Sequence, residues 1–331
     1  MLLAGDVGAT KTDLAIYSTG SNPNSPVARK QFHSADYVSL QAILTEFLAD
    51  MKVPVERATF GVPGPVIARS VVTTNLPWAM DEDSLAAHLK VKAVHLMNDL
   101  EAIAWAIPVL GESDVVTLNL GEPVLKTTIG VIAPGTGLGE SFLVWDGARY
   151  MPQSSEGGHA DFAPTNDRQI RLLEYMRTRF EHVSVERVCS GIGIPNIYEY
   201  LRDVEHVYEA PEITQRIAAA KDPTKAIANA ALDPLHPSQL CRTTMDTFVS
   251  ILASEAGNLA LKVLATGGIY MTGGIAMNIL TLLQTPTFMR AFTNKGRFSD
   301  LMKRIPIRVI TTNAALIGAA TYALENSPHH D

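Results

Sequence analysis

The chain has 331 residues, of which 47% are hydrophobic and 18% are charged, and its formal net charge at pH 7 is −7. This length fits two domains of ordinary size with a large core. The sequence has no cluster of Lys and Arg of the kind that a general nucleic-acid surface needs, so we expect no nucleic-acid partner. Two cysteines are too few for a disulfide framework or a Cys-rich zinc site, which fits a reducing, cytoplasmic location.

The sequence also predicts that no membrane segment is present. The N-terminus lacks the basic region and the long apolar run of a signal peptide. The uncharged stretch 263–289 is long enough for a membrane span, but Gly, Asn and Gln residues interrupt it. A buried strand and turn of a globular protein explains this stretch better.

The first hundred residues have the pattern of a β-rich region with two helices. Apolar residues at positions 40, 43, 44, 47 and 48 follow the helical period, and Ser39 precedes them as a suitable N-cap. Pro63 and Pro65 interrupt one strand, which we expect to resume after them. The expected elements are strands near 1–6, 12–18, 27–33, 58–62, 66–72 and 94–97, and helices near 39–48, 81–89 and 100–109.

A second domain is expected to begin near residue 111, because 108–111 is the best candidate for a boundary. Its pattern predicts strands near 114–119, 126–133, 138–145, 266–271 and 305–311, and helices near 167–181, 186–190, 193–203, 212–220, 237–264 and 313–325. Strand hairpins followed by crossover helices, twice along the chain, describe a duplicated α/β fold with a cleft between its halves. The expected domains are a small one of 1–110 plus 312–331 and a large one of 111–311.

The turn at residues 5–12 is the first candidate site. An apolar strand runs into a turn of Gly, Asp and Thr, where Gly8 and Thr10 would expose N–H and hydroxyl groups without bulky side chains. Such a turn can seat a phosphate. The carboxylate of Asp6 would repel a phosphate directly, so it more plausibly holds a metal ion. The alternative is that these residues only make a hairpin turn.

The same design returns at residues 131–145, with Thr136 and Gly137 in the turn. Laid over the first copy, Ala133 falls on Ala4, Gly137 on Gly8 and Leu143 on Leu14. Two turns of this type suggest two related domains that hold one phosphate chain.

Two polar constellations could carry chemistry. Asn98 and Asp99 end a buried strand and begin a helix, where a carboxylate can accept a proton from a hydroxyl; the alternative is an N-cap. Glu156 and His159 share a Gly-rich loop that could bind a polyhydroxyl ligand, and the loop is a weak metal signal.

Two further segments are weaker signals. Glu186 opens an apolar segment, where an acid could equally support a helix N-terminus. Gly273 and Gly274 make a turn that could let a base or phosphate approach the backbone.

Taken together, these segments resemble the bacterial-type ATP-dependent glucokinases, within the sugar kinase, actin and Hsp70 superfamily. The resemblance covers nearly the whole chain, and the Asn-Asp pair and the Glu-Gly-Gly-His block are its specific parts. It implies an α/β, two-lobed, duplicated ribonuclease-H-like (actin-like ATPase) fold. The motifs that carry it are Gly5 to Thr10, Thr74 to Trp78, Met97 to Ala102, Gly135 to Gly139, Glu156 to Pro164, Glu186 to Gly191 and Thr272 to Ile275.

The resemblance also implies roles at the matching positions. Asp99 would be the catalytic base for the 6-hydroxyl of glucose. Asp6 would lie beside Mg²⁺, with water between them. The first turn departs from the family pattern, since Ala9 stands where a Gly is usual, and its methyl group could crowd the phosphate. The other implied roles are sugar binding by Asn75, Asn98, Glu156, His159 and Glu186, and ATP binding by Gly8, Thr10, Thr136, Gly137, Gly273 and Gly274.

The function implied is transfer of the γ-phosphate of ATP to glucose in glycolysis, by a cytoplasmic enzyme that the family suggests is a homodimer. Two alternatives stay open from the sequence. The chain could phosphorylate another hexose or an amino sugar, or use another phosphoryl donor. It could also be a sugar-responsive regulator that has lost catalysis.

Overall fold

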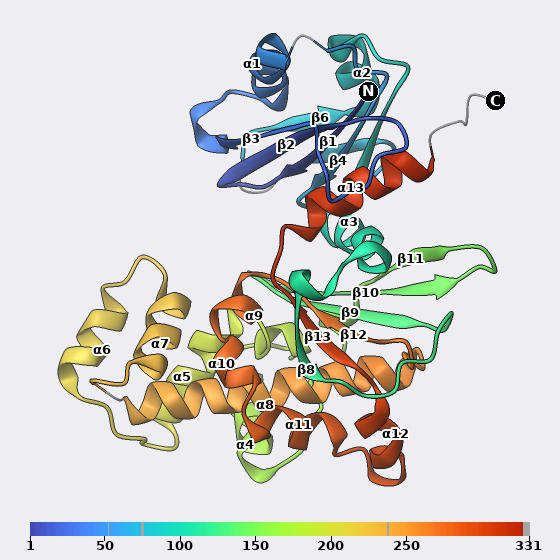
Figure 1. Cartoon of the computed structure of the whole chain (residues 1–331). Coiled ribbons are helices and arrows are strands. Elements are labelled where there is room, and N and C mark those ends of the chain that lie inside the picture. Colours follow the sequence, from blue (N-terminus) through green and yellow to red (C-terminus); the bar gives the residue numbers. More distant parts are fainter. Residues whose placement is uncertain (52, 74–75, 237, 327–331) are drawn as a thin grey trace. The chain divides into compact units, whose positions relative to one another are not determined.

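The computed structural model describes residues 1–51, 53–73, 76–236 and 238–326. By its internal contacts the chain divides into two compact units (Figure 1). Unit 1 consists of Met1–Asp114, Ala148–Gln153 and Thr312–Asp331, and unit 2 consists of Val115–Gly147 and Ser154–Thr311. The domain boundaries expected from the sequence, 1–110 plus 312–331 for one domain and 111–311 for the other, stay a prediction.

Unit 1 is built on a five-stranded sheet in the order β3-β2-β1-β4-β7. β1 pairs antiparallel with β2 and parallel with β4, which pairs parallel with β7. The strands are β1 (Leu2–Val7), β2 (Lys11–Tyr17), β3 (Ala28–His33), β4 (Arg57–Val62) and β7 (Ala93–Asn98), and a separate hairpin is formed by β5 (Ser70–Val72) and β6 (Ala79–Asp81). The helices are α1 (Leu40–Met51), α2 (Glu82–Leu89), α3 (Asp99–Ala106) and α13 (Ala314–Glu325), with short 3₁₀ turns at η1 (Ser34–Asp36), η2 (Ile107–Val109) and η3 (Glu112–Asp114).

The C-terminal helix belongs to the core of unit 1. α13 packs against β1 and α3, and Leu316, Ala319 and Ala320 meet Leu2 and Ala4 of β1. The crossing with α3 is tight, because a Cβ at Gly318 would lie 1.6 Å from the carbonyl oxygen of Ala102. Small residues in α13 therefore let the last helix close over the first strand.

Unit 2 repeats this strand order and adds one strand. Its six-stranded sheet has the order β11-β10-β9-β12-β13-β8; β9 pairs antiparallel with β10 and parallel with β12, and β12 pairs parallel with β13. β8 is the extra strand, antiparallel to β13. The strands are β8 (Val115–Asn119), β9 (Ile129–Pro134), β10 (Leu138–Trp145), β11 (Tyr150–Ser155), β12 (Gly268–Met271) and β13 (Ile307–Ile310). The edge strand β11 belongs to this sheet by its hydrogen bonds, although its residues up to Gln153 are grouped with unit 1 by their contacts.

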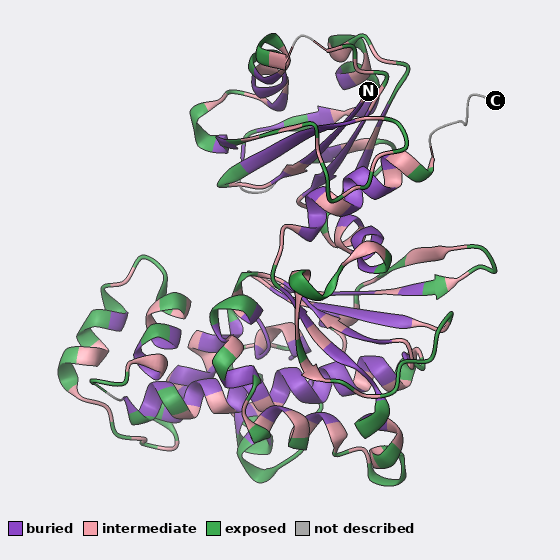
Figure 2. Cartoon of the chain, viewed as in Figure 1, coloured by how far each residue is buried: buried purple, intermediate pink, exposed green. Residues whose placement is uncertain are grey.

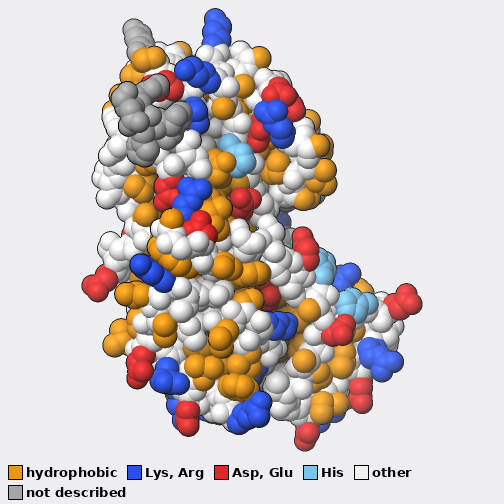
Figure 3. Space-filling model, turned by 90° about the vertical axis from the view of Figure 1, so that its right-hand side faces the viewer, with side chains coloured by type: hydrophobic (Ala, Val, Ile, Leu, Met, Phe, Trp, Pro, Cys, Tyr) orange, Lys and Arg blue, Asp and Glu red, His pale blue; other side chains and the backbone are white. Residues whose placement is uncertain are grey.

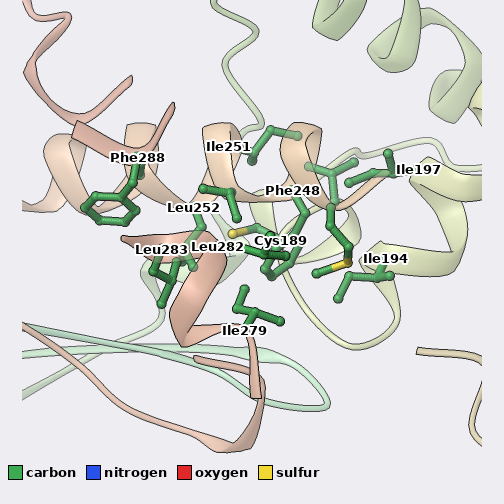
Figure 4. Close-up of a cluster of buried hydrophobic side chains, with 14 of the residues drawn as sticks. Cys189, Ile194, Ile197, Phe248, Ile251, Leu252, Ile279, Leu282, Leu283 and Phe288 are labelled. Atoms are coloured by element: carbon green, nitrogen blue, oxygen red, sulfur yellow. The ribbon is translucent and has the colours of Figure 1, made fainter. Parts of the chain in front are cut away.

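Helices form most of the rest of unit 2, around the buried helix α8 (Figure 2). The helices are α4 (Asp167–Arg177), α5 (Gly193–Asp203), α6 (Pro211–Ala218), α7 (Pro223–Leu232), α8 (Gln239–Lys262), α9 (Gly274–Asn278), α10 (Leu280–Leu283), α11 (Pro286–Thr293) and α12 (Ser299–Arg304), with 3₁₀ turns η4 (Gly157–His159), η5 (Val185–Arg187) and η6 (Gly296–Phe298). Figure 4 shows how Phe248 and Leu252 of α8 pack with Cys189, Ile194 and Ile279. Cys189 is thus a core residue, and burial raises the pKa of its thiol well above the usual value.

The structure confirms the duplicated α/β organisation and most of the expected elements. Three expectations are wrong. The strand expected over 66–72 forms only at Ser70–Val72, since the Pro-rich segment before it has no regular partner beyond a bridge at Ile67. The helix expected at 186–190 is the single 3₁₀ turn Val185–Arg187. The stretch 263–289 contains β12, as expected, but then the helices α9, α10 and the start of α11.

The overlay of the two hairpins also needs correction. Strand pairing centres the first hairpin between Ala9 and Thr10 and the second on Thr136. The two tips are therefore separated by 126 to 127 positions, and the overlay of Gly137 on Gly8, which assumes 129, is wrong by two to three positions. Side chains in a strand alternate between the two faces of the sheet with a period of two residues. An overlay that is shifted by two residues therefore still places apolar residues on apolar residues.

Candidate active site

The turn between β1 and β2 contains Gly8 and Thr10, as predicted. The N–H of Gly8 donates to the carbonyl of Lys11 at 2.9 Å, which closes the turn. Ser34 fixes it from the side, since its hydroxyl donates to the carbonyl of Gly8 at 2.7 Å and its N–H to that of Thr10 at 3.0 Å. Ala9 packs against the apolar core of unit 1. Its methyl group is thus partly buried against this core.

Three carboxylates interact at this end of the sheet in unit 1. Asp6 and Asp13 are paired across β1 and β2, and the charges of Asp13 and Asp99 both act on Asp6. Burial, the largest cause, and these two charges raise the pKa of Asp6 to about 6, while a hydrogen bond from Asn313 opposes the shift. A positive charge near Asp6 would relieve this repulsion.

Asp13 already has its counter-charge. Its side chain is 2% exposed, and the guanidinium of Arg29 donates from Nε to Oδ1 at 3.0 Å and from Nη2 to Oδ2 at 2.5 Å. The amide of Asn313 donates to Oδ2 at 3.1 Å. This bidentate pair leaves Asp6 as the acid of the β1–β2 pair that is available to a ligand.

Asn98 ends β7, and Asp99 is the first residue of α3. The N-cap interpretation holds for Asn98: its Oδ1 accepts the N–H of Leu100 at 2.9 Å, and its Nδ2 donates to the carbonyl of Gly64 at 3.0 Å. Asp99 also accepts the N–H of Leu100, at 2.9 Å, and its side chain is accessible to solvent. Desolvation by the surrounding protein raises its pKa, and the hydrogen bonds from Leu100 and Asn98 oppose the rise. This is the environment of a carboxylate that can accept a proton.

In unit 2 the turn between β9 and β10 contains Thr136 and Gly137. The N–H of Gly135 donates to the carbonyl of Gly137 at 2.9 Å. Segment 186–192 is bonded to this turn at three places. The N–H of Leu138 donates to Oε2 of Glu186 at 3.0 Å, the N–H of Gly191 to the carbonyl of Gly135 at 2.7 Å, and the N–H of Ile192 to that of Thr136 at 3.4 Å.

The loop with Glu156 and His159 lies beside the same segment. It makes the 3₁₀ turn η4, and the side chains of Glu156 and His159 are exposed. Backbone hydrogen bonds join it to the residues before Glu186: the N–H of Val185 donates to the carbonyl of Ala160 at 2.9 Å, and the N–H of Phe162 donates to Val183 at 3.0 Å. The fold therefore brings Glu156, His159 and Glu186 into one neighbourhood, as a shared ligand requires.

Gly273 and Gly274 also reach the β9–β10 hairpin. Gly273 has a φ of +94°, and a Cβ there would lie 2.7 Å from the carbonyl oxygen of Pro134, so only Gly fits. Gly274 and Thr136 both line a pocket of about 620 Å³. Gly137 and Gly273 adjoin these two residues in the chain and do not themselves line it.

The pocket has an apolar part and a polar part, which suits a nucleotide better than an uncharged apolar ligand. Its apolar lining comes from Ile192, Ile194, Ala228, Ile275 and Ile279, and its polar lining from Thr136, Asp222, Thr224, Lys225, Asn229 and Asn278. Among the residues that the structure describes, Lys225 is its one cationic lining residue. The helix α7, which supplies Thr224 to Asn229, was missed in the sequence, although Asp222 before Pro223 is a typical helix start.

Asn75, which the resemblance assigns to the sugar, lies outside the described residues. Within the described ranges, no group of three or more His, Cys, Asp or Glu side chains could hold a metal ion. A divalent cation here would therefore need ligands from water and a substrate's phosphates, and Asp6 fits as the carboxylate beside it, because a cation offsets the charges that raise its pKa. Along the ranges that the structure describes, no helix is long and apolar enough to cross a membrane.

The repeated sheet topology, the two glycine turns and the accessible Asp99 define the class of the protein: a sugar kinase of the actin-like ATPase fold. A family profile described as Glucokinase matches residues 3–326. The chain belongs to the glucokinase family, and its activity is the ATP-dependent phosphorylation of glucose.

Individual relatives agree with this assignment. The chain is 39% identical to a glucokinase of Nostoc punctiforme, with 98% of each chain covered, and 33% identical to one of Yersinia enterocolitica, with 97% and 95% covered. A crystal structure of a glucokinase from an Antarctic psychrotroph is 31% identical, with 98% and 99% covered and a TM-score of 0.86. A Streptomyces griseus ROK family glucokinase, in complex with glucose and AMPPNP, shares the fold with a TM-score of 0.63 at 16% identity over 98% and 99%.

Proposed function

We propose that the chain transfers the γ-phosphate of ATP to the 6-hydroxyl of glucose, with Asp99 as the base that accepts the hydroxyl proton. The observation that carries the proposal is the state of Asp99: an accessible carboxylate at the start of α3 whose pKa is raised by desolvation. A general base needs access to the proton and a pKa that is not too low, and Asp99 meets both conditions. Phosphoryl transfer asks little more of the protein than positioning and charge neutralisation.

We assign sugar binding to Asn75, Asn98, Glu156, His159 and Glu186. The support is that the loop of Glu156 and His159 is hydrogen-bonded to the residues before Glu186. The amide of Asn98 is oriented by one bond at each polar atom, to Gly64 and to Leu100, and its second N–H and second lone pair stay available to a sugar hydroxyl.

We assign nucleotide binding to the turns of Gly8 and Thr10 and of Thr136 and Gly137, with Gly273 and Gly274 beside the base. The support is the pocket that Thr136 and Gly274 line. Mg²⁺ bound through water to Asp6 would neutralise charge on the phosphates. We further propose a cytoplasmic, glycolytic role and a homodimer, on the basis of the family alone.

The test is a coupled ADP-release assay of the purified chain on a panel of sugars and phosphoryl donors. We expect the highest kcat/KM with glucose and ATP, and no turnover after Mg²⁺ is removed with a chelator. A sugar that lacks a matched hydroxyl should lose at least tenfold in kcat/KM, because it leaves a polar partner in the site unpaired. A higher kcat/KM for an amino sugar or another hexose, or for another donor, would contradict the assignment.

A further inference from the structure

Segment 183–192 is bonded to both of the substrate loops in unit 2. Its first part joins the loop of residues 156–162 through the backbone of Val183 and Val185. Its second part joins the β9–β10 turn through Gly191 and Ile192. One segment thus connects the sites that we assign to sugar and to phosphate, with Glu186 at the junction.

The carboxylate of Glu186 faces the backbone of the phosphate turn. Its Oε2 accepts the N–H of Leu138 at 3.0 Å. The contact exists because residue 137 has no side chain: a Cβ at Gly137 would lie 2.4 Å from Oε2. Oε1 has no hydrogen-bond partner within the part of the chain that the structure describes.

The sugar loop meets the same residue, Leu138, at its carbonyl group. A Cβ at Gly158 would lie 2.1 Å from the carbonyl oxygen of Leu138, so the loop backbone packs directly on it. Leu138 therefore has its N–H on Glu186 and its carbonyl against the sugar loop. A movement of either neighbour must move the exit of the phosphate turn.

We propose that Glu186 is a positioning residue that couples glucose binding to nucleotide binding. A carboxylate has two acceptor oxygens, so Oε1 can accept a sugar hydroxyl while Oε2 keeps the N–H of Leu138. Glucose then fixes the carboxylate, the carboxylate fixes the turn of Thr136 and Gly137, and the nucleotide meets a turn that is already ordered. By linkage, the nucleotide raises the affinity for glucose by the same factor. The inference rests on the proposed sugar role of Glu186.

The test measures the Kd of glucose by calorimetry without nucleotide and with saturating Mg²⁺ and AMPPNP. For the natural chain we expect the nucleotide analogue to lower the glucose Kd about tenfold, within the usual range of coupling between sites. In Glu186→Gln a neutral amide with one acceptor oxygen and an NH2 donor replaces two charged acceptor oxygens, so the hydrogen bonds to Leu138 and to the sugar hydroxyl both weaken and this factor should fall toward one. In Gly137→Ala the carboxylate remains but is displaced from Leu138, so the factor should fall as well.

The matched control is Glu181→Gln, which changes an exposed acid two residues before this segment and should keep the tenfold factor. If Glu186 had only a structural role, Glu186→Gln would weaken the binding of both glucose and nucleotide. The ratio of the glucose Kd without nucleotide to the glucose Kd with it would then stay at about ten, and that result would overturn the inference. A factor of one in the natural chain, with glucose phosphorylation intact, would also overturn it without touching the proposed function. Absence of glucose phosphorylation would instead reject the function itself.

Discussion

At the scale of single residues, Glu140 is an unusual group for a protein interior. It is 2% exposed in β10, and its Oε1 has no hydrogen-bond partner within the described residues. It lies directly below the sugar loop, since a Cβ at Gly157 would be 2.0 Å from its Oε2. Burial, followed by repulsion from Glu255, raises its pKa to about 7, while Lys262 opposes the shift. The protein therefore favours the protonated form.

The buried carboxyl of Glu140 should make the free energy of unfolding depend on pH. Because the folded pKa of about 7 lies above the ordinary 4.5, the folded state binds the proton more tightly. The resulting stabilisation is full below pH 4.5 and is lost as the pH rises through 7. We expect Glu140→Gln to be more stable than the natural chain at pH 8, by roughly 3 kcal/mol relative to any difference at pH 4.

Denaturant unfolding of both proteins between pH 4 and pH 8 measures this difference. Equal pH dependence in the two proteins would show that Glu140 ionises without penalty. Glu174→Gln, a carboxylate change in α4 of the same unit, serves as the control and should leave the pH dependence unaltered.

At the scale of elements, α7 contributes one wall of the pocket to which we assign the nucleotide. Lys225 lies in its first turn and lines the pocket together with Thr136 of the β9–β10 turn. Thr224 connects this helix to the segment of Glu186, since its hydroxyl donates to the carbonyl of Gly191. A cation in this place can attract the phosphates of a nucleotide.

We expect Lys225→Ala to raise the KM for ATP about tenfold and to change the KM for glucose little. Loss of one charge-assisted contact to a phosphate accounts for an effect of this size. Steady-state kinetics with each substrate varied in turn makes the measurement. Lys221→Ala removes an exposed lysine that does not line the pocket and should behave like the natural chain. If the KM for ATP is the same in Lys225→Ala and Lys221→Ala, Lys225 does not contact the nucleotide.

The elements also show what the sequence could predict. The strands and their Gly turns have local signals, so β1, β2, β9 and β10 were predicted to within a few residues. The hairpin overlay failed because alternation in strands does not fix a register. The helix α7 was missed although its start signal was present, and the position of Lys225 in a pocket depends on tertiary packing.

In the candidate site, too, some residues could be predicted from the sequence and others could not. Asp99, Glu156 and His159 stand in motifs that can be read along the chain. The bond between Glu186 and the N–H of Leu138 joins residues 48 positions apart, and only the folded chain reveals it. The salt bridge that makes Asp13 unavailable likewise depends on the pairing of β2 with β3, which places Arg29 beside it.

At the scale of the whole molecule, Lys and Arg side chains share the visible surface with Asp and Glu side chains (Figure 3). On the face drawn in Figure 3, acidic and basic side chains alternate across the surface, in keeping with a net charge of only −7. Electrostatic steering of a large anionic partner is not expected from such a surface. The charges to which we assign a function are those of single groups such as Asp6, Asp99 and Lys225.

The reaction leads us to expect a conformational change of the whole chain when glucose binds. Water is also a hydroxyl nucleophile, so a kinase that stayed open would hydrolyse ATP. We expect glucose to induce a more closed form through a hinge near 109–112 and the start of α13. Small-angle scattering should show a smaller radius of gyration with glucose than without it, and identical curves would refute the closure.

The most direct test of the account is the activity of Asp99→Asn. The variant keeps the shape of the side chain and the acceptor for Leu100 but cannot take up the proton of the 6-hydroxyl. Glu101→Gln, the same chemical change two residues further along α3, is the control and should retain normal turnover. We predict that Asp99→Asn lowers kcat about a thousandfold while glucose still binds with a near-normal Kd. A turnover close to that of the natural chain would contradict the central claim that this carboxylate is the base.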